Sequence, residues 1–136
     1  MSLTLITSDE NKFINIGTSD NWISLVSTVD VRLKNCKKDI SAAINFLISG
    51  KCDAASASEV AKQFKIIRTE LSKFKPDQII YDADNPDKEA PWKDNISPTI
   101  TSCADFYTTA DGKDLLSEIV DILTYAAAKG VSVELM

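Results

Sequence analysis

The densest group of side chains able to do chemistry is a run of carboxylates between residues 82 and 94. Its acidic members are Asp82, Asp84, Asp87, Glu89 and Asp94. Carboxylate oxygens are the ligands that Ca²⁺ and Mg²⁺ prefer, but an EF-hand loop needs glycine at its sixth position and glutamate at its twelfth. Counted from Asp82, these positions hold Asp87 and Lys93. The spacing excludes an EF-hand and favours a solvated acidic loop. A small enzyme that uses these carboxylates with a divalent metal is the alternative.

Histidine is absent from the sequence, which restricts the chemistry further. Without imidazole there is no Ser-His or Cys-His nucleophile pair, no histidine general base and no histidine metal ligand. The four glycines are isolated, so the sequence contains neither a phosphate-binding loop nor a dinucleotide fingerprint. We therefore predict no catalytic, cofactor-binding or metal-binding residues, and a protein that is not an enzyme.

The cysteines and the N-terminus indicate the compartment. Cys36, Cys52 and Cys103 are odd in number and widely spaced, which favours buried or incidental thiols over a disulfide framework or a zinc site. The first residues lack the features of a secretory signal, and no apolar run reaches the roughly 18 residues of a membrane helix. We expect a cytoplasmic protein with no membrane partner.

Aromatic residues lie close to the carboxylates in the sequence. Trp92, Phe106 and Tyr107 stand among several aspartates, and aromatic anchors ringed by carboxylates suit an interface with a basic protein. The residues predicted to bind a partner are Asp84, Asp87, Glu89, Trp92, Asp94, Asp105 and Tyr107. In the alternative interpretation, Trp92 folds back and covers the edge of a sheet.

Charge is distributed unevenly along a chain whose net charge is -5. Residues 30–75 contain ten Lys or Arg against five Asp or Glu, and residues 76–136 contain four against twelve. An acidic half repels nucleic acid and attracts a cationic partner, whereas the basic middle fits the solvated faces of helices. We expect a protein partner and no nucleic acid.

The 136 residues fit one domain, 1–136, with one hydrophobic core. Residues 3–7 and 13–16 read as two strands joined by the turn-forming sequence SDEN, a β-hairpin. A helix follows, with Ser19 or Asp20 as its N-cap and an apolar stripe from Trp22 to Leu33. A second, shorter helix with apolar positions from Ile40 to Ile48 ends at Gly50.

The rest of the chain predicts two more helices and two strands. Ser56 and Glu59 have the spacing of a capping box at the start of a third helix, which Pro76 stops. Residues 79–81 read as a buried strand, and the connection 82–109 is long enough to be functional or to hide an extra strand or helical turn. Asp111 can cap the last helix, which ends at Gly130, and residues 131–135 alternate like a strand.

These elements predict an α/β (α+β) fold. It has an N-terminal β-hairpin, three central helices and a C-terminal β-α-β unit with parallel neighbours, in a mixed sheet covered by helices.

The sequence resembles a family of bacterial polymorphic-toxin immunity proteins, the one numbered seventy. The residues that carry the resemblance are PWKDNISP at 91–98, FYTTADGKDL at 106–115 and IGTSD at 16–20. Membership implies a cytoplasmic protein without catalysis that binds and neutralises a cognate secreted toxin domain, in many cases a nuclease. Acidic inhibitors suit the basic clefts of nucleases, and the charge of residues 76–136 agrees with this.

Two other hypotheses remain open at this point. One is the small metal-dependent carboxylate enzyme. The other is a scaffold or regulator that associates with itself through a sheet edge formed by the terminal strand, residues 131–135. The sequence leaves open whether the protein is a monomer or a homodimer.

Overall fold

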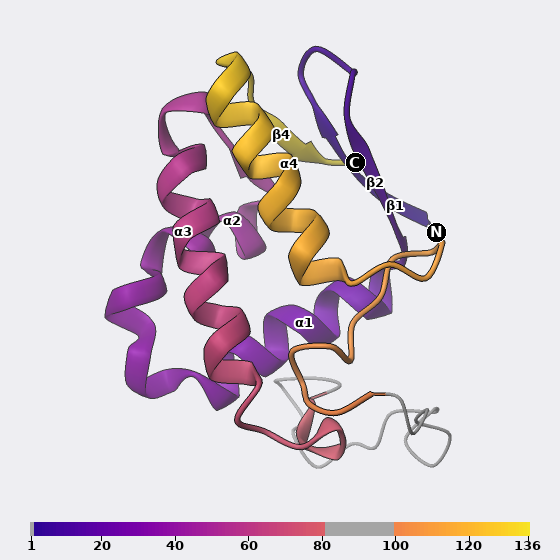
Figure 1. Ribbon diagram of the computed structural model, residues 1–136, viewed down its shortest axis with the longest axis vertical. Helices are drawn as coiled ribbons and strands as arrows, with labels where there is room; N and C mark the ends of the chain where they lie inside the picture. Colours follow the sequence, from indigo (N-terminus) through magenta and orange to yellow (C-terminus); the bar gives the residue numbers. More distant parts are fainter. Residues whose placement is uncertain (1, 81–99) are drawn as a thin grey trace.

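The computed structural model describes residues 2–80 and 100–136. Its strands are β1 (Ser2–Thr7), β2 (Phe13–Thr18), β3 (Lys51–Cys52) and β4 (Val133–Leu135). They form a four-stranded sheet in the order β2-β1-β4-β3, and every pairing in it is antiparallel (Figure 1). The fold class is α+β, as the sequence predicts.

The predicted hairpin is confirmed. Ile6 pairs with Phe13, and the turn closes where the Thr7 amide donates to the Lys12 carbonyl at 3.0 Å. Asp9 organises the turn by accepting from the Thr7 hydroxyl at 2.6 Å and from the Asn11 amide at 3.1 Å. These bonds stabilise the carboxylate and lower the pKa of Asp9 from 3.8 to about 2.

The prediction of a parallel C-terminal β-α-β unit is wrong. β4 lies between β1 and β3 and runs antiparallel to both, with Ile6 opposite Glu134 and Lys51 also opposite Glu134. A β-α-β unit needs a strand before the last helix, but Ile79 and Ile80 are not in a strand. Because β4 has a partner on each side, it offers no edge for the self-association that the sequence left open.

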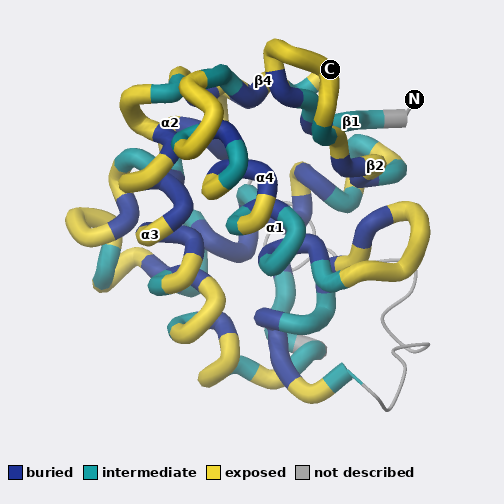
Figure 2. Tube along the Cα trace, turned by 45° about the horizontal axis from the view of Figure 1, so that its top comes forward, coloured by how far each residue is buried: buried dark blue, intermediate teal, exposed yellow. Residues whose placement is uncertain are grey.

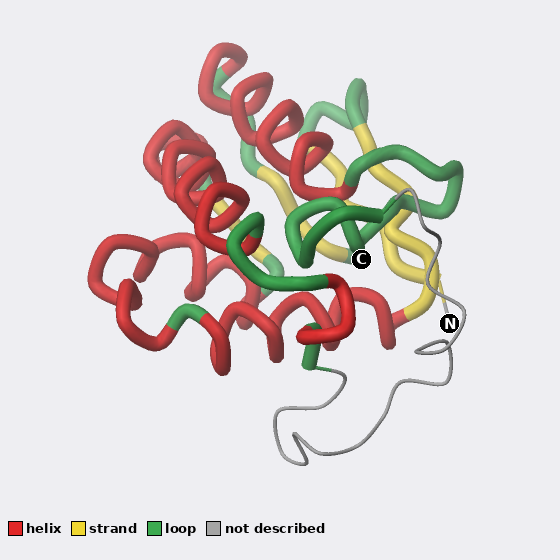
Figure 3. Tube along the Cα trace, turned by 60° about the horizontal axis from the view of Figure 1, so that its bottom comes forward, coloured by secondary structure: helices red, strands yellow, loops and turns green. Residues whose placement is uncertain are grey.

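Four α-helices and two 3₁₀ helices are described. They are α1 (Ser19–Arg32), η1 (Lys34–Ile40), α2 (Ser41–Ser49), α3 (Ala54–Leu71), η2 (Pro76–Gln78) and α4 (Leu115–Lys129). α3 and α4 run side by side, and the helices gather on one side of the sheet (Figure 3). The burial of β2 agrees, since Ile14 and Ile16 are buried whereas Phe13 and Asn15 on the opposite face are exposed.

The helix starts differ from the predicted ones. The N-cap of α3 is Asp53, whose carboxylate accepts from the Ser56 amide at 2.9 Å, so Ser56 is the capped residue and not the cap. The N-cap of α4 is Asp114, three residues beyond the predicted Asp111. Both helices still begin at a carboxylate, which accepts hydrogen bonds from the amides of the first turn. The N-cap of α1 is Thr18, with no side-chain cap.

The predicted helix ends are confirmed at two glycines. Gly50 follows α2 with φ +72° and Gly130 follows α4 with φ +68°, the left-handed conformation that glycine adopts without a Cβ penalty. The stop attributed to Pro76 is placed too late, because α3 already ends at Leu71 and Pro76 begins η2.

One hydrophobic cluster joins the sheet to the helices. Figure 2 shows its buried positions facing inward from the helices, with exposed positions on the outside. Trp22, Phe46 and Phe64 connect α1, α2 and α3 through two edge-to-face ring contacts of 6.1 and 5.9 Å between centroids. The Trp22 indole donates to the Leu47 carbonyl at 3.1 Å, so its polar atom is satisfied inside the core.

Candidate partner-binding surfaces

The predicted partner-binding residues fall into two groups. Asp84, Asp87, Glu89, Trp92 and Asp94 lie outside the described residues, as does the carboxylate run of the alternative metal enzyme. Asp105 and Tyr107 are described. They lie on one segment but face different surroundings.

Tyr107 lies in the core and not on the surface, so its side chain has no exposed area to offer a partner. Its hydroxyl oxygen is 2.9 Å from Ser24 Oγ and 2.7 Å from Thr28 Oγ1, both on α1. Burial raises the pKa of Tyr107 above its ordinary value of 10.0, so the hydroxyl remains protonated as a hydrogen-bonding group. The aromatic residue that the sequence assigned to a partner therefore anchors its own segment to α1.

The same two α1 hydroxyls hold Ile80. Ser24 donates to the Ile80 carbonyl at 2.9 Å, and the Ile80 amide donates to Thr28 Oγ1 at 2.8 Å. These bonds satisfy the buried backbone that a strand partner would otherwise satisfy. They explain why the buried residue Ile80 needs no strand partner. Of the predicted strand 79–81, Ile79 and Ile80 are not in a strand, and Tyr81 lies outside the described residues.

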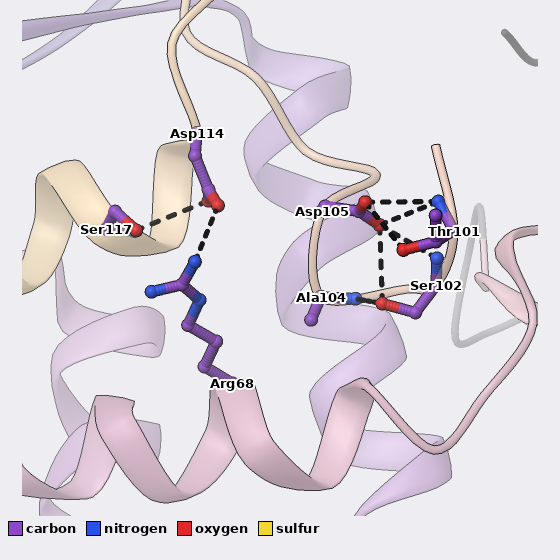
Figure 4. A network of polar contacts seen from close by, with 7 residues as sticks. All are labelled: Arg68, Thr101, Ser102, Ala104, Asp105, Asp114 and Ser117. Atoms are coloured by element: carbon purple, nitrogen blue, oxygen red, sulfur yellow. Dashed lines mark hydrogen bonds and ion pairs between the residues drawn. The ribbon is translucent and has the colours of Figure 1, made fainter. Parts of the chain in front are cut away.

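Asp105 closes a tight turn at the surface (Figure 4). One carboxylate oxygen accepts from the Ser102 amide at 2.8 Å, and the other accepts from the Thr101 amide and hydroxyl at 3.0 and 2.9 Å. Partial burial acts to raise the pKa of Asp105, but these donors outweigh it and the pKa is lowered. The carboxylate therefore carries its charge at neutral pH and holds the turn. Within the described residues 100–108, the extra strand or helical turn that the sequence allowed is replaced by bends, this turn and an isolated bridge between Thr108 and Asp114.

A further acidic residue links two helices. Asp114 caps α4 and also accepts from Arg68 of α3, with 3.2 Å between Asp114 Oδ2 and Arg68 Nη2 (Figure 4). Arg68 belongs to the basic stretch of the sequence and Asp114 to the acidic half. Their contact places the two charge types side by side on the α3–α4 surface.

A small polar pocket lies where the 109–113 loop covers the outer edge of β2. The Ala110 amide donates to the Asn15 carbonyl at 2.8 Å, which joins the loop to the strand. The pocket holds about 180 Å³, and its lining includes Asp111, Glu118 and Lys113, with Lys113 Nζ 3.6 Å from Asp111 Oδ2. Thr109 donates a hydrogen bond to Asp111, and this bond lowers the pKa of that carboxyl.

An apolar groove lies between α1 and α2, and it consists of two adjoining hollows of about 380 and 200 Å³. Both hollows share a wall of Val26, Ser27, Leu47 and Ile48. The side chain of Ile48 is 72% exposed, and that of Ile23 in the larger hollow is 49% exposed. We call this feature the α1–α2 groove.

The sequence did not predict this groove. It assigned Ile48 to the core stripe of a short helix and did not single out Ile23. One signal was available, because α2 has apolar residues at six of its nine positions, more than one buried face can use. The surplus apolar side chains remain at the surface.

The thiols and carboxylates of the described residues form no other site. The three cysteines form no disulfide, and within 2–80 and 100–136 no three Cys, Asp or Glu side chains are grouped as metal ligands. Burial raises the pKa of the Cys52 thiol from 9.0 to about 11. None of the described helices is long and apolar enough to cross a membrane.

The chain was compared with protein families, with curated proteins and with solved structures. The family described as Immunity protein 70 matches residues 6–135. No curated protein and no solved structure matches the chain. The match spans the fold from the end of β1 to β4 and confirms the resemblance noted in the sequence. The chain belongs to the Immunity protein 70 family.

Proposed function

We propose that this protein is an immunity protein that binds a cognate bacterial toxin domain and neutralises it without catalysis. The observation that carries the proposal is the family match over residues 6–135. Because the match covers nearly the whole chain, the proposed inhibitor is the complete fold and not a small part of it.

The toxin that fits this protein best is a nuclease. The chain has a net charge of -5, and residues 76–136 carry twelve acidic side chains against four basic ones. A nuclease binds a polyanion through basic residues, so an acidic inhibitor is attracted to the same surface. Such long-range attraction raises the association rate and is weakened by salt. The protein then acts in the cytoplasm, where the nuclease would otherwise meet nucleic acid.

The acidic contact surface that we propose retains the residues singled out by the sequence. It comprises Asp84, Asp87, Glu89, Trp92, Asp94 and Asp105, without the buried Tyr107. Asp105 is the described member of this surface, and its carboxylate lies at the surface turn formed with Thr101 and Ser102.

Co-expression with the toxin domain encoded by the neighbouring upstream gene tests the function. We expect growth to be restored, and the two proteins to co-elute as a complex whose association rate falls with added salt. An unrelated acidic protein of similar size and charge serves as the control and should give no protection. If the wild-type protein neither protects the cells nor binds that domain, the proposed function is wrong.

A further inference from the structure

We propose that the α1–α2 groove anchors the toxin by receiving an amphipathic helix of the toxin domain, with two apolar side chains about one turn apart in the two hollows. This inference rests on the proposed function and adds to it the binding surface and the chemistry of the bound segment. The acidic surface attracts the toxin, and the groove holds it.

The lining of the groove determines the chemistry of its occupant. Asp30 is the one charged residue that lines either hollow, and the shared wall presents Val26, Leu47 and Ile48. Ile48 and Ile23 are two of four large apolar side chains that are exposed in the described part of the chain. Apolar side chains that cover these walls remove surface from water, which stabilises a complex.

The spacing of the hollows fits a helix. The larger hollow is lined by α1 residues 22–27 and the smaller by residues 26–30, so their centres are offset along α1 by about one turn, or roughly 5 Å. Side chains at positions i and i+4 on a helix are separated by about the same distance. Two helices also provide the ridges between which a third helix packs.

Ion pairs border the groove at two places. Asp30 at the smaller hollow is 2.9 Å from Lys37, and Lys51 is 3.7 Å from Glu134 beside the larger hollow, where Gly50 and Leu135 form part of the lining. An apolar centre with a polar, solvent-accessible rim is the usual composition of a protein interface. The bound helix should therefore be apolar on one face and polar at both ends of that face.

Charge favours the toxin over a second copy of this chain as the occupant. Two copies, each with a net charge of -5, repel one another at long range, which disfavours a second copy in the groove. Self-association through the groove is the competing outcome, which the test below distinguishes.

The test compares binding kinetics with a catalytically inactive form of the toxin domain. Ile48→Ser and the double variant Ile23→Ser/Ile48→Ser remove apolar contact without changing charge, and both sites are exposed, so the fold should be retained. We expect the dissociation rate to rise about tenfold or more and the association rate to change by less than about threefold. Phe13→Ser is the matched control, since Phe13 is 59% exposed on β2 and does not line the groove. It should leave the dissociation rate unchanged.

The outcomes separate this inference from the proposed function. If wild type protects cells and the groove variants dissociate as slowly as wild type, the groove is not the anchor and the immunity function stands. If the wild-type protein fails to bind, both ideas are wrong. If light scattering shows a wild-type dimer that Ile48→Ser converts to a monomer with unchanged toxin binding, a second copy occupies the groove and the inference is overturned.

Discussion

The hydroxyl oxygen of Tyr107 lies 2.7 Å from Thr28 Oγ1, although the two residues are 79 positions apart in the chain. Ser24 is bound by the same hydroxyl, and both α1 residues also bind Ile80. This buried network therefore holds two distant parts of the chain, at Ile80 and at Tyr107, to the same helix.

Tyr107→Phe should lower the free energy of unfolding by about 1–2 kcal/mol, because it removes one buried hydroxyl while Ser24 and Thr28 keep the Ile80 carbonyl as acceptor. Urea denaturation followed by circular dichroism measures the change. Tyr125→Phe is the control, since its hydroxyl bonds Asp9 at the exposed hairpin turn and its loss should matter less. Equal stability of Tyr107→Phe and wild type would contradict the role given to this network.

Asp105→Asn should reduce the change in melting temperature between neutral pH and about pH 3. The folded-state pKa of Asp105 is lowered, so its contribution is present above the ordinary value of 3.8 and is lost as pH falls through the lower folded value. Asparagine has no such titration, and its amide nitrogen cannot accept the bonds that the second carboxylate oxygen of Asp105 accepts from the Thr101 amide and hydroxyl. Melting temperatures at neutral pH and near pH 3 measure the effect. If the melting temperatures of the variant and of wild type change equally with pH, the ionised Asp105 carboxylate does not stabilise the protein through this turn.

Asp114→Ala should destabilise the protein by about 1–2 kcal/mol, since it removes both the N-cap of α4 and the partner of Arg68. The matched control is Asp111→Ala, three residues earlier, where the carboxylate bonds Thr109 and does not cap the helix. Denaturant midpoints should order the variants as wild type, Asp111→Ala and then Asp114→Ala. The reverse order would mean that the helix begins at Asp111, as its sequence suggests.

Two glycine variants separate backbone strain from crowding. Gly50→Ala and Gly130→Ala both place alanine in the left-handed region, at a cost of about 1–2 kcal/mol each. A Cβ on Gly50 would also lie 3.0 Å from Leu135 Cβ, whereas one on Gly130 meets no atom within 4 Å. β4 has a strand on each side and cannot easily move away. Gly50→Ala should therefore lose about 1 kcal/mol more, measured by urea denaturation. Equal losses would show that Leu135 adjusts freely.

Cys52 should react slowly with a thiol reagent in the folded protein. Its pKa of about 11 leaves roughly one thiolate per thousand at pH 8, and its side chain is buried. Cys36 is more exposed and should react first in a time course with a chromogenic disulfide. In denaturant, all three thiols should react at one fast rate. A fast reaction of native Cys52 would contradict its burial.

Local patterns in the sequence predicted most of the secondary structure. The hairpin follows from two short apolar runs around a polar turn, and the left-handed ends of α2 and α4 follow from Gly50 and Gly130. The buried stripe Val60, Phe64 and Ile67 of α3 repeats every three or four residues. Each of these signals lies within a few residues of the structure it produces.

The sites were harder to predict, because a residue type does not reveal which face it will occupy. Tyr107 is of a residue type that often anchors protein interfaces, yet it is buried. Ile48 is of a type that usually lies in the core, yet it is exposed. The difference depends on what packs against each residue. Hydroxyl groups on α1 face Tyr107, and none of the described elements covers Ile48.

The sequence by itself determined the acidic charge of residues 76–136, the absence of histidine, the glycine stops of α2 and α4, and the family to which the chain belongs. Only the tertiary structure decided that β4 lies antiparallel between β1 and β3, that Ile80 is bound by α1 and not by a sheet, and that α1 and α2 leave an apolar groove. The physical reason is that charge and helix termination depend on neighbouring residues. Strand partners and exposed faces depend on contacts between segments far apart in the chain, which local periodicity does not encode.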